Sequence, residues 1–85
     1  MATPGTGWLV GLPIIGAAAM TSGTAITNPG RAIMITASVA GTASLTLANG
    51  STIVVNPAVG DNIYPFSVMT ATDGTATVTH YYNLN

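Results

Sequence analysis

The chain contains no cysteine, no lysine and no glutamate, and His80 is its only histidine. Without cysteine it can form neither a disulfide nor a thiolate metal site, and its redox compartment cannot be read from the sequence. Its 85 residues are enough for one domain, and a domain of this size is only marginally stable. The chain therefore lacks the disulfides and thiolate metal sites that often stabilise domains of this size.

Charge is also scarce. Charged residues make up 4% of the chain, against roughly 25% in an ordinary soluble domain, and they are Arg31, Asp61 and Asp73. A net charge of −1 gives no electrostatic reason to expect nucleic acid or a membrane as a partner. Polarity comes from threonine, serine and asparagine, which suits a surface covered by copies of the chain or by other partners.

The apolar run WLVGLPIIGAAAM at residues 8–20 is too short to cross a membrane, because it has 13 residues where about 20 are needed. No basic residue precedes it, as one would in a secretory signal, although Ala17–Ala19 resembles a cleavage site. We interpret residues 1–24 as an N-terminal arm for docking or subunit contact, and residues 25–85 as a single β domain. The alternative is that the run folds back as one more core strand.

From Arg31 onward the pattern predicts strands. RAIMITAS, residues 31–38, is apolar on both faces, which is typical of a central strand covered on two sides. Residues 58–62 read as a loop, and IYPFSVMTAT, residues 63–72, as one strand that Pro65 places at an edge or a strand start. Its expected shared face is Tyr64, Phe66, Val68 and Thr70.

The C-terminal residues predict a second hairpin, turning at Asp73-Gly74. Its last strand is expected to place Ala76, Val78, His80, Tyr82 and Leu84 on one face, and Thr75, Thr77, Thr79 and Tyr81 on the other. No window has a helical period, and Ala25-Ile26-Thr27 reads as a short edge strand. The sequence therefore predicts an all-β fold: a small antiparallel β-sandwich or barrel of about five to seven strands with an extended N-terminal arm.

LTLANGSTIVV, residues 45–55, predicts a hairpin with two possible registers. A strict two-residue Asn-Gly turn pairs Leu47 with Thr52, whereas a type I turn with a bulge at Gly50 pairs Leu47 with Ser51. The bulged register places apolar beside apolar and hydroxyl beside hydroxyl, and a one-residue slip would invert every side chain. We predict the bulged register, with an apolar face of Ala43, Leu45, Ile53 and Val55 and a hydroxyl face of Ser44, Thr46 and Thr52.

The titratable residues are too few for an enzyme, which needs a positioned pair of such groups. Asp73 is expected to cap its own turn, Asp61 to do the same in its loop, and His80 to be a packed or interface histidine. A metal site would need more ligands, unless several subunits contributed. We expect no catalytic activity, no cofactor and no metal.

Binding to single-stranded nucleic acid needs a basic groove, which Arg31 alone cannot form. A carbohydrate platform of Trp8, Tyr81 and Tyr82 is disfavoured because neighbouring strand residues point to opposite faces. An ice-binding array is disfavoured because TATVT, residues 75–79, stops after three threonines. These exclusions leave an assembly role as the main hypothesis.

From Ala25 to the C-terminus, the order of the motifs resembles the spike-base and capsid decoration (cement) proteins of tailed phages and phage-like particles. Residues 1–24 have no counterpart in that pattern, and FSVMTAT lacks the basic residue that relatives often carry after the proline. The motifs that carry the resemblance are Ala25-Ile26-Thr27, Arg31-Ala32-Ile33, LTLANGSTIVV, IYPFSV, ATDGTATV and YYNLN.

The resemblance implies a location in the virion and a homo-oligomer, with the major capsid protein or neighbouring virion proteins as partners. A small tail or baseplate adaptor and a receptor- or glycan-binding module are the alternatives. Large apolar side chains dominate interfaces, and Arg31 is expected to pair with Asp61 or Asp73 within or between subunits. The predicted interface residues are Trp8, Leu9, Ile14, Ile15, Arg31, Tyr81 and Tyr82.

Overall fold

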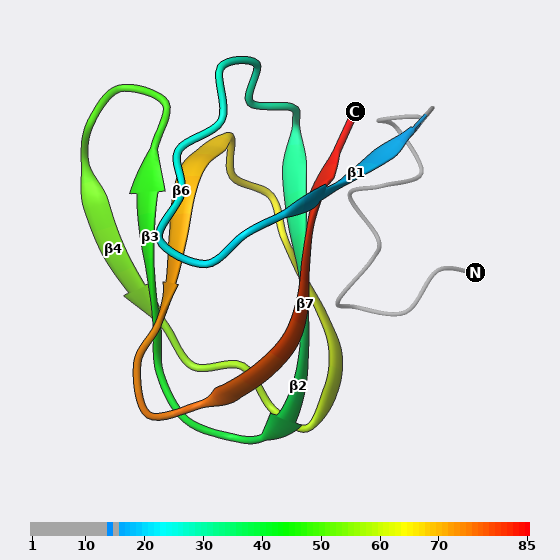
Figure 1. Ribbon diagram of the computed structural model, residues 1–85, viewed down its shortest axis with the longest axis vertical. Helices are drawn as coiled ribbons and strands as arrows, with labels where there is room; N and C mark the ends of the chain where they lie inside the picture. The colour runs from blue at the N-terminus through cyan, green and yellow to red at the C-terminus, as the bar shows by residue number, and fades with distance from the viewer. Residues whose placement is uncertain (1–13, 15) are drawn as a thin grey trace.

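Two antiparallel sheets face each other in the computed structural model, which describes residues 14 and 16–85 (Figure 1). Sheet A has the strand order β1-β7-β2-β5, and sheet B the order β4-β3-β6. The predicted all-β antiparallel sandwich is confirmed; the predicted arm lies largely outside the described residues. The strands are β1 (Ala17–Met20), β2 (Ala32–Val39), β3 (Ala43–Leu47), β4 (Thr52–Val55), β5 (Gly60–Tyr64), β6 (Val68–Asp73) and β7 (Thr77–Leu84).

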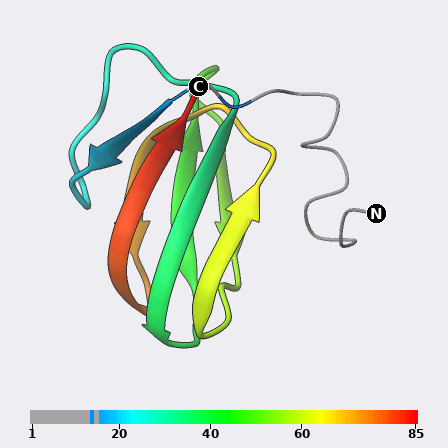
Figure 2. The same ribbon diagram turned by 90° about the vertical axis from the view of Figure 1, so that its right-hand side faces the viewer.

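The core lies between the sheets and is built from alternate residues of each strand, as the two-residue period of a strand requires. Ile33 and Ile35 of β2 and Leu45 of β3 are completely buried. The predicted central position of the strand is confirmed, because β2 lies between β7 and β5 (Figure 2), but only one of its faces packs against the other sheet, and Met34 on the opposite face is half-buried. The core cluster comprises Met20, Ile33, Ile35, Ala43, Leu45, Val55, Val68, Ala71 and Tyr81.

The hairpin of β3 and β4 has the predicted bulged register. Leu45 pairs with Ile53, and the Leu47 N–H donates to the Ser51 carbonyl at 2.7 Å. The Gly50 N–H donates to the Leu47 carbonyl at 2.9 Å, and Gly50 has a φ of 90°. This combination of a type I turn and a left-handed glycine matches the twist of the strands.

Gly50→Ala is expected to lower the free energy of unfolding by about 1 kcal/mol, because a side chain at positive φ is strained. Backbone strain is the only cost expected, because a Cβ at Gly50 would meet nothing within 4 Å and so would cause no steric clash. Gly16→Ala is the matched control, because that position is equally open and its φ is not in the left-handed region. Urea unfolding checks the pair; equal stabilities would contradict the bulged turn.

Residues 63–72 form parts of two strands in different sheets, so the prediction of one strand is wrong. β5 ends at Tyr64 as the edge of sheet A, and β6 begins at Val68 as the edge of sheet B. Pro65 lies directly after the edge strand, where its missing N–H removes no ladder bond. The predicted loop at 58–62 is also shorter than expected, because β5 begins at Gly60.

Asp73-Gly74 does not turn a hairpin, because β6 belongs to sheet B and β7 to sheet A. The expected faces of the last strand are right for His80, Tyr82 and Leu84, which share one face, but wrong before them. Thr36 pairs with His80 and Ala37 with Val78, so Thr79 is the extra residue of a β-bulge. Val78 therefore packs against the core together with Tyr81 instead of sharing a face with His80.

Residues 17–24 pack with the sandwich, which corrects the predicted arm boundary at residue 24. β1 pairs with β7, and Met20 is buried in the core. The chain then follows the edge of β6, where the N–H groups of Gly23 and Ile26 donate to the carbonyls of Ala71 and Met69 at 2.8 and 2.9 Å. The predicted edge strand at 25–27 is therefore not a strand, although it covers a sheet edge.

Candidate interaction surfaces

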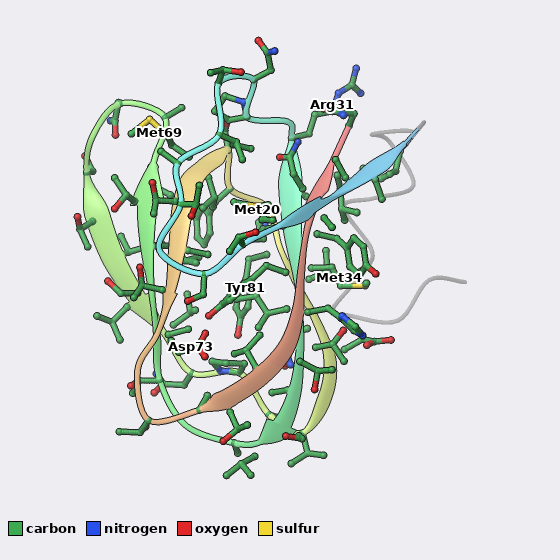
Figure 3. All side chains as sticks on the ribbon, in the orientation of Figure 1. Met20, Arg31, Met34, Met69, Asp73 and Tyr81 are labelled. Atoms are coloured by element: carbon green, nitrogen blue, oxygen red, sulfur yellow. The ribbon has the colours of Figure 1, made fainter. Side chains whose placement is uncertain are left out.

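The outer face of sheet A has a row of large side chains. Because Ile33 and Ile35 point into the core, Met34 between them points outward, and Figure 3 shows it on the other side of sheet A from Tyr81. Met34 pairs with Ile63 of β5 and Tyr82 of β7, and all three are half-buried. By the same alternation this face consists of Ala17, Ala19, Ala32, Met34, Thr36, Asp61, Ile63, His80, Tyr82 and Leu84, of which Ala32 and Leu84 are already buried in the single chain.

The outer face of sheet B is a small array of hydroxyl groups. Thr46 lies between Thr52 and Thr70 in the register of the three strands, and Ser44 lies between Val54 and Thr72. The predicted hydroxyl face of the hairpin is confirmed, and β6 extends it. Val54 is the one apolar member and has 64% of its surface exposed. This face consists of Ser44, Thr46, Thr52, Val54, Thr70 and Thr72, and none of these residues is charged.

The predicted interface residues fall in different environments. Tyr81 is only 4% exposed and belongs to the core, so its prediction as an interface residue is wrong. Tyr82 lies on the outer face of sheet A, Arg31 is exposed and Ile14 is half-buried. The remaining predicted anchors, Trp8, Leu9 and Ile15, lie outside the described residues.

Tyr81 and Asp73 connect the two sheets (Figure 3). The Tyr81 hydroxyl of β7 donates to Asp73 Oδ1 of β6 at 2.6 Å, and the Ser22 hydroxyl donates to the same oxygen at 3.3 Å. Asp73 therefore binds side chains distant in sequence instead of capping its own turn as predicted. Burial, and then the hydrogen bond and negative charge of Asp73, raise the pKa of Tyr81.

Asp61 lies on β5 and accepts a hydrogen bond from the Thr36 hydroxyl at 2.7 Å, so its predicted loop cap is also wrong. Thr36 is five residues along β2 from Arg31, a separation of about 16 Å in a strand. In Figure 3 Arg31 lies near the top of the molecule and Asp73 in its lower half, well apart from it. The ion pair predicted within one chain is therefore not formed, and pairing between subunits stays a prediction.

His80 is exposed on the outer face of sheet A, where its ring centroid lies 5.6 Å from that of Tyr82. In residues 14 and 16–85, no group of three or more histidine and acidic side chains gathers in a way that could hold a metal ion. The same part of the chain contains no helix that is long and apolar enough to span a membrane. The described side chains thus form two outer faces that are uncharged or nearly uncharged.

Two features of these surfaces were not predicted. The row through Met34 was missed because Ile63 was assigned to the start of a strand continuous with β6. Val54 was missed as an exposed group because the hairpin pattern does not tell which of its strands is at the sheet edge. Comparisons with protein-family models, curated proteins and solved structures found no match.

Proposed function

We propose that the chain is a non-enzymatic structural protein of a phage virion, a capsid decoration (cement) or head spike-base subunit. It assembles through the uncharged surfaces of its sandwich. The observation that carries this proposal is the near-absence of charge on the two outer faces. Asp61 is the only acidic or basic side chain assigned to them apart from the imidazole of His80, and Asp61 is hydrogen-bonded to Thr36.

Such faces suit burial against neighbouring proteins. Taking a charge out of water is costly unless it is paired, whereas a threonine hydroxyl needs only a neutral hydrogen-bond partner. The row formed by Met34, Ile63 and Tyr82 adds apolar and aromatic area. Each Å² of that area removed from water contributes about 25 cal/mol, before the entropy of ordering is subtracted. A capsid lattice offers contacts on several sides at once.

The resemblance of the motifs from Ala25 onward supports the same role. The glycan-binding alternative loses its aromatic platform, because Tyr81 is buried in the core while Tyr82 lies on the outer face of sheet A. The tail-adaptor alternative demands the same uncharged interfaces. It differs from the capsid role in the number of copies per particle.

The test is the composition of purified particles. Particles banded from a lysate of a host that carries the gene are expected to contain the chain, detected by mass spectrometry, together with the major capsid protein. Cryo-electron microscopy then counts the copies: hundreds indicate decoration, tens indicate vertices, and a dozen or fewer indicate a tail ring. Absence of the chain from intact particles would overturn the proposal.

Charge insertion tests the role of the two faces. Met34→Lys and Thr46→Lys place one cation at the middle of each face. At the face that contacts the particle, the change is expected to weaken binding at least about tenfold, equivalent to about 1.4 kcal/mol, and so to lower occupancy. Val59→Lys is the control, because Val59 is 68% exposed in the loop between β4 and β5. Circular dichroism checks that each variant is folded. Full occupancy by both face variants would contradict assembly through these faces.

A further inference from the structure

The free edge of β4 exposes backbone groups that have no partner in the described chain. The Leu47 N–H bonds to Ser51, so in an antiparallel ladder the next bonded pairs are Leu45 with Ile53 and Ala43 with Val55. The N–H and C=O groups of Thr52 and Val54 therefore point away from β3. No hydrogen bond from residues 14 or 16–85 reaches them.

Two other sheet edges are protected. The carbonyls of Met69 and Ala71 on the β6 edge accept hydrogen bonds from the chain between β1 and β2. The β5 edge carries Asp61 and is followed by Pro65, and charge and proline are both common devices against edge pairing. β4 carries no charge, and its nearest proline, Pro57, lies two residues beyond its end, so the edge itself has neither device.

We propose that β4 pairs antiparallel with β4 of a second copy of this chain, about a two-fold axis at Val54. The backbone of Val54 then forms hydrogen bonds with Val54 of the second copy, and the backbone of Thr52 with Asn56 of the second copy. The two three-stranded sheets join into one continuous sheet. An isologous contact of this kind is closed, so it produces a dimer and not a fibre.

The second copy is favoured as the occupant because β4 is complementary to itself. In this register Val54 meets Val54 on the outer face, Ile53 meets Val55 on the core side, and Thr52 meets Asn56. Centring the axis on Ile53 instead would place Val54 beside Thr52 and leave the exposed valine beside a hydroxyl. No charge on TIVV repels its copy, and a charged foreign strand would find no opposite charge there.

The area of the contact predicts its strength. Edge pairing over about five residues buries less than the roughly 1,200 Å² of a standard stable interface. The dimer is therefore weak for the isolated protein and becomes populated when the protein is concentrated, as on a particle surface. This inference rests on the proposed function only for that setting, since pairing itself can be measured on the purified chain.

Sedimentation over a range from micromolar to millimolar protein tests the pairing. The mass is expected to rise toward twice 8.5 kDa. Val54→Lys, which would bring two cations together at the axis, is expected to raise the dissociation constant at least about tenfold. Val59→Lys is the matched control, because it makes the same change at a valine of similar exposure, 68% against 64%. A chain that stays monomeric at millimolar concentration would overturn the proposal, as would equal dimerisation by the two variants.

Single cysteines test the register, because the natural chain contains none. Mild oxidation of the full-length Val54→Cys variant is expected to give a disulfide-linked dimer, since directly opposed residues lie within bridging distance. Thr52→Cys and Val59→Cys are expected to remain largely uncrosslinked. Crosslinking of Thr52→Cys in preference to Val54→Cys would overturn the axis at Val54.

The two proposals fail separately. A dimer that is never found in particles would overturn the virion role and leave the β4 contact standing. A chain that is abundant in particles but stays monomeric when pure would overturn the β4 contact and leave the virion role standing. If only Val54→Lys lost occupancy while the pure protein stayed monomeric, the edge would bind a foreign strand, and the second copy would be wrong as its occupant.

Discussion

Leu45→Ala is expected to lower the free energy of unfolding by about 3 kcal/mol, within the 2–5 kcal/mol typical of buried leucines. Leu45 is completely buried in the middle of β3, and its neighbours in the ladder are Ile53 and Ala71. The two sheets that enclose the Leu45 side chain are held by their strand pairing, so they cannot move close enough to fill the cavity that the substitution leaves. Because small domains are stable by only about 5–15 kcal/mol, the midpoint in urea, followed by circular dichroism, should fall markedly.

Leu47→Ala is the matched control on the same strand. Leu47 is only partly buried at the end of β3, where it packs against the rim of the core. The same deletion there removes less buried area and leaves a site that water can reach, so less than half the loss is expected. Equal losses from the two variants would contradict the position of Leu45 at the centre of the core.

The features that could be predicted from the sequence are those that local chemistry determines. The register of the β3–β4 hairpin follows from Gly50 and from the matched apolar and hydroxyl positions on either side of the turn. The central position of β2 follows from apolar residues on both of its faces. In each case the residues that carry the signal lie within one element or one tight turn.

The errors occur where the chain passes from one sheet to the other. Alternation shows which residues share a face, but it does not show whether the next segment continues in the same sheet. Residues 63–72 therefore read as one strand although Pro65 and its neighbours cross between the sheets. Asp73-Gly74 has the composition of a hairpin turn, yet it also makes a crossing between sheets.

The surfaces were predicted in the same uneven way. The hydroxyl face of sheet B could be predicted, because it is the reverse of the hairpin's core face. The bulge at Thr79 could not, because an extra residue appears only when β7 is paired with β2, and it moves Tyr81 relative to Val78. The exposed edge of β4 depends on strand order, which is a tertiary property.

Tyr81→Phe is the second large effect that we expect. The change removes only the hydroxyl that joins β7 to Asp73 across the core, and a hydrogen bond to a charged group contributes about 1.5–3 kcal/mol. Because Asp73 is exposed enough to be hydrated in the variant, we expect a loss near the lower value. Tyr82→Phe is the control, since Tyr82 lies on the outer face of sheet A.

The same variant changes the response to alkaline pH. The pKa of Tyr81 is raised in the folded chain, so the folded state holds this proton more tightly than the unfolded state does. The resulting stability is fully present below the usual tyrosine pKa of about 10 and is lost as pH rises above it, with a slope of up to about 1.4 kcal/mol per pH unit. Burial also raises the pKa of Tyr64, so some alkaline loss remains without Tyr81.

Urea unfolding between neutral pH and pH 11 separates these contributions. We expect stability to fall more gently with pH in Tyr81→Phe than in the natural chain, whereas Tyr82→Phe keeps the steep fall. The gentler slope reports the loss of the buried hydroxyl, because burial alone already raises the pKa of Tyr81, whereas the loss of stability at neutral pH reports its bond to Asp73. An unchanged slope, together with an unchanged stability at neutral pH, would show that the contact with Asp73 does not hold the two sheets together.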